Sequence, residues 1–260
     1  MLAYVIFIEP YWVEVEQMDL TLPHLDPAFE ELKIVQISDL HAGPTFNHDY
    51  YTQVIKTINE LQPDLVVLTG DFVYHDGDKY APLVLPVLNE LAPKSASLAV
   101  LGNHDYWENA PLVRSVLQNA GIIELPNQVY TLQRGTASLH IVGLDDGWEH
   151  HNDIDLALQS LPAEGAAILL IHEPDFADDY SKLSRFDLQI SGHSHGGQVI
   201  LPLGSPFLVP RYATKFRMGL YQVRNMLLYV NRGIGAANPP ARLNCRPEIT
   251  LFTLHAPSNP

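Results

Sequence analysis

The first half of the chain alternates short apolar runs with amphipathic segments, and this alternation constrains the fold more than any other feature. The apolar runs have the length of buried strands, whereas the segments between them repeat apolar residues at helical spacing. The expected strands are 33–38, 64–69 and 97–101, and the expected helices are 49–61, 81–91 and 109–120. This order predicts parallel strands covered by helices.

The pattern changes after Val129, where strand signals continue but helical segments become fewer. Strands are expected at 129–133, 139–144, 166–171, 188–191, 198–201, 220–223, 227–231 and 249–254, and a half-buried strand is expected at 13–22. The later strands predict a second sheet, more antiparallel than the first and packed against it. Since neither a repeat nor a low-complexity linker divides the chain, residues 1–260 are expected to form a single domain.

Composition indicates a compact protein with no disulfide framework. Apolar residues make up 47% and charged residues 17% of the 260 residues, and the net charge of −15 disfavours binding to a nucleic-acid backbone. The single cysteine, Cys245, cannot form an internal disulfide, which favours a reducing compartment. The apolar N-terminus lacks the basic start of a signal peptide and is too short to span a bilayer. We therefore expect a cytoplasmic protein, soluble or peripheral at the inner membrane face.

Side chains that can bind metal ions follow predicted strands at five places. These are Asp39 with His41, Asp71, Asn103 with His104 and Asp105, His172, and His193 with His195. Open α/β sheets present ligands at strand ends. Imidazole nitrogens mixed with carboxylate and amide oxygens suit Mn, Fe, Zn or Ni better than Ca. One such motif is common by chance, but five in order predict a metal site.

These motifs resemble those of calcineurin-like metallophosphoesterases. The matching segments are Asp39-x-His41, Gly70-Asp71, Gly102-Asn103-His104-Asp105, His172 and Gly192-His193-x-His195. A bacterial subgroup of phosphodiesterases, which includes enzymes acting on a UDP-linked lipid A precursor, is similar in further segments: Gly196-Gly197-Gln198, Leu201-Pro202, Gly219-Leu220-Tyr221 and Pro240-Ala241-Arg242. The resemblance implies an α/β fold, a four-layer αββα sandwich with two mixed β-sheets and a dinuclear metal site at the strand ends.

The resemblance also implies a role for each residue of these motifs. One divalent transition-metal ion would be bound by Asp39, His41, Asp71 and His195, and a second by Asp71, Asn103, His172 and His193. Two such ions can generate a bridging hydroxide and hold the phosphate oxygens. His104 matches the family's non-ligand histidine, which would protonate the leaving oxygen or stabilise the transition state. Its neighbour Asp105 would fix the tautomer of His104.

One position departs from the family pattern. Many members carry an aspartate three residues after the bridging one, whereas this chain has Tyr74 there. The ligand set stays intact, but the surroundings of Asp71 are in doubt. Among the histidines that match no motif, four are expected in loops or at the surface: His48, His75, His150 and His151.

A basic stretch follows the last metal motif. No acidic residue occurs between Asp187 and Glu248, whereas seven basic residues do: Arg211, Lys215, Arg217, Arg224, Arg232, Arg242 and Arg246. They could pair with the acidic body of the protein. Alternatively, they could form an anion-binding rim, with the apolar segment 207–210 contacting a lipid or a membrane surface. The sequence leaves both interpretations open.

The combined features predict a metal-dependent phosphoester hydrolase, most simply a phosphodiesterase or pyrophosphatase. Its substrate would be a phosphorylated small molecule or a lipid-linked phosphodiester, with no obligate protein partner. Because substrate choice depends on surrounding loops, a phosphomonoesterase or protein phosphatase is the alternative. A non-catalytic metal-binding scaffold is a third class, which the complete ligand set disfavours.

Overall fold

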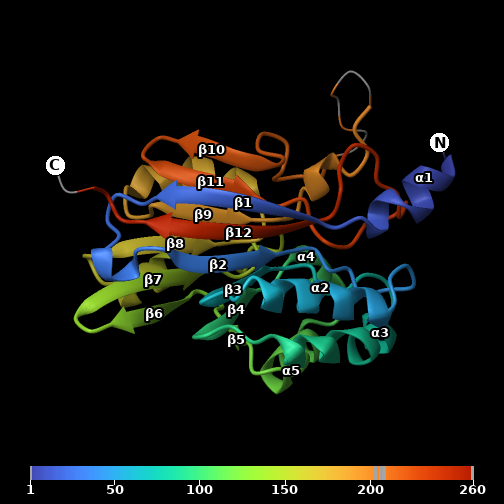
Figure 1. Ribbon diagram of the computed structural model, residues 1–260, viewed down its shortest axis with the longest axis horizontal. Helices are drawn as coiled ribbons and strands as arrows, with labels where there is room; N and C mark the ends of the chain where they lie inside the picture. Colours follow the sequence, from blue (N-terminus) through green and yellow to red (C-terminus); the bar gives the residue numbers. More distant parts are fainter. Residues whose placement is uncertain (1, 202–203, 205, 207–208, 259–260) are drawn as a thin grey trace.

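Two six-stranded sheets pack face to face in the computed structural model, and helices cover their outer faces (Figure 1). The structure describes residues 2–258 except 202–203, 205 and 207–208. Both sheets mix parallel and antiparallel pairs. The four-layer αββα sandwich implied by the resemblance is therefore confirmed.

The first sheet contains the predicted parallel strands. Its order is β1 (Glu14–Thr21), β12 (Glu248–His255), β2 (Leu32–Ile37), β3 (Leu65–Thr69), β4 (Ala96–Val100) and β5 (Ile123–Glu124). Strands β2 to β5 run parallel to one another, whereas β12 is antiparallel to β2. The segment 249–254 was predicted for the second sheet, and this placement is wrong. The last strand of the chain, β12, inserts between β1 and β2, and the local sequence pattern does not reveal this pairing.

Helices α2 (His48–Glu60), α3 (Gly77–Val84) and α5 (Ala110–Asn119) cover the outer face of the first sheet. The side chain of Asn47, rather than Asp49, caps α2 by accepting the Tyr50 N–H. The helix expected at 81–91 divides into α3 and a 3-10 turn. Pro86 lies in that turn, and its missing N–H prevents a continuous α-helical hydrogen-bond ladder.

The second sheet is parallel at its centre and antiparallel at both edges. Its order is β10 (Gly219–Val223), β11 (Met226–Val230), β9 (Leu188–Ser191), β8 (Ala166–Leu170), β7 (Ala137–Gly143) and β6 (Gln128–Arg134). The strand expected at 198–201 does not form, because Gly196, Gly197 and Gln198 adopt positive φ angles that turn the chain. Within the described residues, Val199 forms only an isolated bridge with Leu243.

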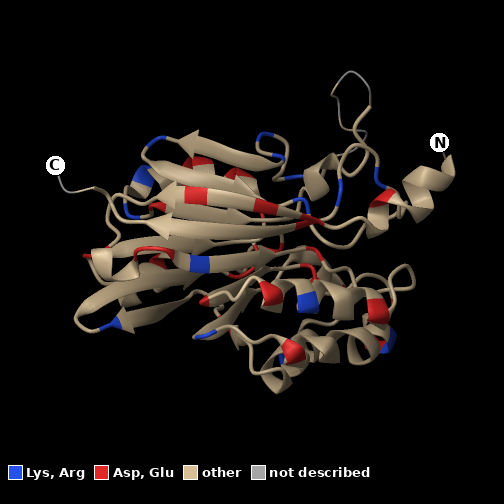
Figure 2. Ribbon diagram, viewed as in Figure 1, with Lys and Arg blue, Asp and Glu red and all other residues tan. Residues whose placement is uncertain are grey.

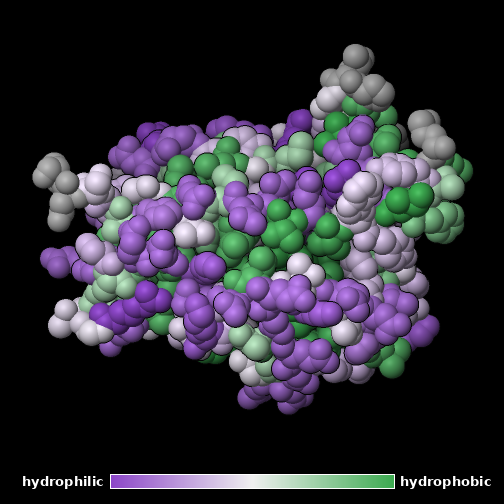
Figure 3. Space-filling model, in the orientation of Figure 1, coloured by the Kyte–Doolittle hydropathy of each residue, from purple (hydrophilic) through white to green (hydrophobic). Residues whose placement is uncertain are grey.

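Shorter helices complete the described structure. They are α1 (Leu2–Phe7), α4 (Asn103–Glu108), α6 (Ile154–Ser160) and α7 (Ala177–Tyr180). Apolar side chains of α1 face solvent at the N-terminal end of the molecule, with Leu2 75% and Phe7 70% exposed (Figure 3). No helix among the described residues is both long enough and apolar enough to cross a bilayer. The predicted location and membrane contact stay predictions.

The main core lies between the two sheets. Ile34 of β2, Phe252 of β12 and Ile168 of β8 are fully buried there. Because these side chains come from facing sheets, their packing fixes how the strand ends of one sheet lie against those of the other.

Replacing Ile168 with alanine should lower the free energy of unfolding by about 2–5 kcal/mol, because it leaves a cavity between the sheets. Leu156→Ala is the control, since Leu156 is 48% exposed on α6 and its loss should change stability by about 0.5 kcal/mol or less. Urea unfolding in the presence of a chelator measures both variants without a metal contribution. Equal unfolding midpoints for the two variants would contradict this account of the core.

Candidate metal centre

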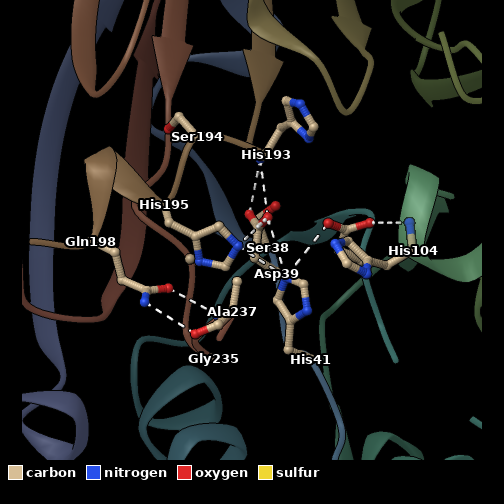
Figure 4. A network of polar contacts seen from close by, with 12 residues as sticks. Ser38, Asp39, His41, His104, His193, Ser194, His195, Gln198, Gly235 and Ala237 are labelled. Carbon is tan, nitrogen blue, oxygen red and sulfur yellow. Dashed lines mark hydrogen bonds and ion pairs between the residues drawn. The ribbon is translucent and has the colours of Figure 1, made fainter. Parts of the chain in front are cut away.

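Polar side chains from both sheets meet where their strands end. The first sheet supplies Asp39 and His41 after β2, Asp71 after β3 and Asn103 at the start of α4, and the second supplies His172 after β8 and His193 with His195 after β9. All seven are buried. Figure 4 shows the ring of His41 facing that of His195, beside the Asp39 carboxylate.

The side chains form two groups that share Asp71. Ligand atoms of Asp39, His41, Asp71 and His195 lie within 4.8 Å of one another, and so do those of Asp71, His172 and His193. The first group has the residues that the family resemblance implied, and the second has those residues apart from Asn103. The cluster fits a dinuclear site for divalent metal ions, with Asp71 between the two positions.

Two imidazole rings of the second group are each oriented by a hydrogen bond on the side that faces away from the site. His172 Nδ1 lies 2.6 Å from the carbonyl oxygen of Thr69 and therefore carries a proton, so Nε2 is the ring nitrogen that faces the site. His193 Nε2 donates in the same way to the carbonyl of Arg211 at 2.8 Å. The freed atoms, His172 Nε2 and His193 Nδ1, lack a hydrogen-bond partner among the described residues, as does Asn103 Oδ1.

Side-chain nitrogen and oxygen atoms lie close to one another across the site. His172 Nε2 lies 3.1 Å from Asp71 Oδ2, and His41 Nε2 lies 2.9 Å from His195 Nε2. Buried lone pairs at these distances repel unless a proton or a cation lies between them. The donor set of neutral imidazole, carboxylate and amide oxygen therefore fits divalent transition-metal ions.

Burial keeps three of the imidazoles neutral, which is the form that binds metal. It lowers the pKa of His193 to about 3 and the pKa values of His41 and His195 well below the usual range. Burial alone would raise the pKa of Asp71 and lower that of His172, but the attraction between these two side chains lowers the pKa of Asp71 and raises the pKa of His172. A metal ion that binds His172 must therefore displace its proton.

The backbone at the ligands is strained. Five of them have left-handed φ angles between 48° and 67°, namely Asp39, His41, Asp71, His193 and His195. This conformation costs about 1–3 kcal/mol at a non-glycine residue and persists only where the surroundings enforce it. Here the N–H of His41 donates to the carbonyl of Asp71 at 3.0 Å, and the N–H of Gly235 donates to that of Asp39 at 2.7 Å.

Gly192 allows the two sheets to approach each other at the site. A Cβ atom at this position would lie 1.8 Å from Ser38 Oγ and 2.5 Å from Asp39 Oδ2. The neighbouring N–H of His193 donates to the Asp39 carboxylate at 3.1 Å (Figure 4). Glycine is therefore required for the ligands after β2 and β9 to meet.

His104 and Asp105 do not form the pair that was expected. The ring of His104 lies 4.9 Å from that of His41, between centroids, and lines the pocket beside the metal cluster. The Asp105 carboxylate instead accepts backbone N–H groups of Gly102, Asp71, Phe72 and Val73 at 2.8–3.2 Å. Asp105 is thus a positioning residue for the loops after β3 and β4, because their N–H groups converge on its carboxylate.

Tyr74 occupies the space where the family pattern often has a carboxylate. Its ring lies 5.0 Å from the rings of both His41 and His104. An aromatic ring therefore lies beside these two histidines, at the chain position where a carboxylate is often found in the family. The four histidines expected in loops or at the surface are exposed, as predicted: His48, His75, His150 and His151.

Part of the basic stretch forms ion pairs with acidic residues elsewhere in the protein. Lys215 contacts Asp178, and Arg232 contacts Glu14 and Glu16 of β1. Figure 2 shows the acidic positions along β1 in red. Arg211 and Arg217 form no ion pair within the described part of the chain, so the anion-rim hypothesis remains open for these two. Phe207 and Leu208 of the predicted apolar segment, like Pro202 of the subgroup motif, lie outside the described residues.

A pocket of about 300 Å³ opens beside the cluster. Asp71, Asn103 and His104 line its polar side, whereas Trp107 and Trp148 line its apolar side. The sequence analysis missed both tryptophans. No local signal marks them, because they follow different strands and meet only in the folded chain.

The fold and the cluster define a class of α/β proteins that bind divalent metal ions between two mixed sheets. This chain belongs to the calcineurin-like phosphoesterase family, whose pattern matches residues 32–197, including all seven candidate ligands. Membership identifies it as a hydrolase of phosphoester bonds.

Curated relatives match nearly the whole chain. An uncharacterized metallophosphoesterase of Bacillus subtilis strain 168, YkuE, is 36% identical over 97% of this chain and 89% of its own length. Phosphodiesterase YaeI of Escherichia coli K12 is 31% identical over 97% of this chain and 92% of its own length. The similarity thus extends beyond the metal motifs.

Solved structures with low sequence identity share the fold. The phosphopantetheinyl hydrolase of Mycobacterium tuberculosis has a TM-score of 0.51 at 13% identity, covering 78% of this chain and 89% of that protein. The sulfate thiohydrolase SoxB of Thermus thermophilus has a TM-score of 0.52 at 14% identity, covering 88% and 57%. At such identities the comparison supports the fold alone.

Gly192→Ala should abolish most metal binding, because the added methyl group collides with Ser38 and displaces the Asp39 carboxylate. Gly135→Asn is the matched control. A Cβ at Gly135 would meet no atom within 4 Å, and asparagine tolerates its positive φ. Metal content after reconstitution and dialysis measures the effect. Full metal content in Gly192→Ala would show that the close approach is not required.

Proposed function

We propose that this protein is a metal-dependent phosphodiesterase or pyrophosphatase with two divalent metal ions. The observation that carries the proposal is the complete set of buried ligands in two groups that share Asp71. When bound, two such ions supply an activated water and neutralise the phosphate oxygens during in-line displacement. The first group would be Asp39, His41, Asp71 and His195, and the second Asp71, Asn103, His172 and His193.

Two observations support a diester or pyrophosphate rather than a monoester. The pocket continues past the polar cluster to an apolar wall, which gives room for a second organic group on phosphorus. The relative YaeI, 31% identical, carries the name phosphodiesterase. That the substrate is a lipid-linked or UDP-linked phosphodiester stays a prediction, and the assay described below tests it.

His104 would act on the leaving oxygen. Its ring lines the pocket, while its backbone N–H donates to Asp71 Oδ1 at 2.9 Å. This hydrogen bond ties the position of the ring to the shared carboxylate. The ring can therefore donate a proton or a hydrogen bond to a substrate oxygen without itself binding an ion.

Asp71→Ala should lower both metal content and turnover sharply, since one carboxylate serves both ligand groups. Asp155→Asn, on the exposed face of α6, is the control and should match the parent. The assay compares an aryl phosphodiester, an aryl phosphomonoester and a UDP-linked lipid after metal reconstitution. Full activity in Asp71→Ala, or no hydrolysis by the metal-loaded parent, would refute the proposed function; a strong monoester preference would refute the diester assignment.

His104→Ala should retain most of its metal but lose on the order of 10²–10⁴ in turnover, the usual contribution of a positioned acid or base. The loss should shrink for substrates with a good leaving group, because these need less protonation. His48→Ala, an exposed histidine on α2, is the control. Turnover across a series of leaving groups measures the effect, and equal losses across the series would argue against an acid role.

A further inference from the structure

Two tryptophans form a wall beside the metal cluster, although neither belongs to the metal groups. The indole rings of Trp107 and Trp148 lie 5.4 Å apart between centroids, at an interplanar angle of 88°. Trp107 lies 4.7 Å from the ring of His104, and Trp148 lies 5.6 Å from that of His193. The wall therefore extends from the candidate acid to a candidate metal ligand.

Buried carboxylates hold Trp148 in place. Glu173, which is fully buried and directly follows His172, accepts the N–H groups of Gly147 and Trp148 at 3.1 and 2.9 Å. Asp146, also fully buried, accepts the N–H of Glu149 at 2.6 Å. The loop that carries Trp148 is thus fastened to the chain beside a candidate metal ligand.

The same loop also holds Trp107. Its indole Nε1 donates to Glu149 Oε1 at 2.7 Å. Although its ring is fixed, Trp107 is 49% exposed. A large ring held half in water beside a polar cluster leaves an apolar face free for a ligand. The facing wall of the pocket is also mainly apolar, with Val199, Val209 and Pro239.

We propose that Trp107 and Trp148 form an aromatic clamp that binds a planar aromatic group of the substrate, on the ester side of the reacting phosphorus. This inference rests on the proposed function and names its substrate class, a phosphodiester that carries a nucleobase or another aryl group. Both are flat rings, which perpendicular indoles can contact face-on and edge-on.

The size of the pocket favours a ring over a long acyl chain. Its volume of about 300 Å³ is at the lower end for a ligand site, and it suits one ring system next to a phosphate. Two aromatic contacts correspond to a preference of about five- to 150-fold in kcat/KM, since each contributes about 0.5–1.5 kcal/mol beyond buried area.

The test uses phosphorothiolate diesters that share one non-aromatic leaving group, ethanethiolate, so that the leaving group cannot occupy the clamp. The other ester group is methyl, octyl, 2-naphthylmethyl or thymidin-5′-yl, and a disulfide reagent measures the released thiol. The parent enzyme should hydrolyse the naphthylmethyl or the thymidine ester about tenfold or more faster than the methyl ester, in kcat/KM. The faster of these two shows whether the ring is a nucleobase or a simple aryl group.

Trp148→Leu, which keeps an apolar side chain but removes the ring, should lose most of the preference for the aromatic ester over the methyl ester. Trp148→Phe should retain part of it, because it retains a ring. Trp12→Leu is the matched control, since Trp12 is 50% exposed and contacts Arg246 instead of the pocket. Metal content is measured for each variant, and equal content shows that the cluster is intact.

The outcomes separate the clamp from the proposed function. If all four esters react equally, or if the octyl ester is preferred and that preference survives Trp148→Leu, the clamp is refuted while the hydrolase stands. If the metal-loaded parent hydrolyses none of them, the proposed function is refuted, and the clamp with it. An equal preference in Trp148→Leu and the parent also refutes the clamp.

Discussion

The structure depends on one electrostatic constraint, which is that buried nitrogen and oxygen atoms of ionisable side chains converge from two sheets. His172 and His193 each use one ring nitrogen to donate to a backbone carbonyl, so their other nitrogens face the site. The shared Asp71 carboxylate lies among them. Buried groups this close need a proton or a cation between them, and the cluster therefore fits divalent metal ions.

The surrounding structure maintains that convergence through backbone hydrogen bonds. The Asp105 carboxylate accepts hydrogen bonds from four backbone N–H groups in the loops after β3 and β4. On the opposite side, the buried Arg242 guanidinium donates to the carbonyls of Arg232, Gly233 and Gly235, which holds the 233–235 loop against Asp39. Below the site, Gln36 donates to Thr69 Oγ1 and to the Ser191 carbonyl, joining the two sheets. These contacts fix the strained ligand backbone.

Reaction chemistry and substrate choice have separate structural sources here. The candidate metal ligands come from strand ends within the segment that matches the family pattern, whereas the two tryptophans come from the 145–149 loop and helix α4. Loops tolerate change more readily than strands, so related proteins can keep the metals and alter the wall. The carboxylate of Glu173 connects the two parts, because it follows His172 in the chain and binds the loop that carries Trp148.

The sequence by itself determined the parallel strands β2, β3 and β4 of the first sheet and the ligand motifs. Each ligand directly follows a strand whose apolar pattern is local, so chain order alone shows that Asp39, Asp71 and His193 lie at strand ends. Only the tertiary structure decided that β12 inserts between β1 and β2, that Asp105 binds backbone N–H groups, and that Trp107 meets Trp148. These features join residues far apart in the chain, and their positions depend on packing between the sheets, which no local pattern encodes.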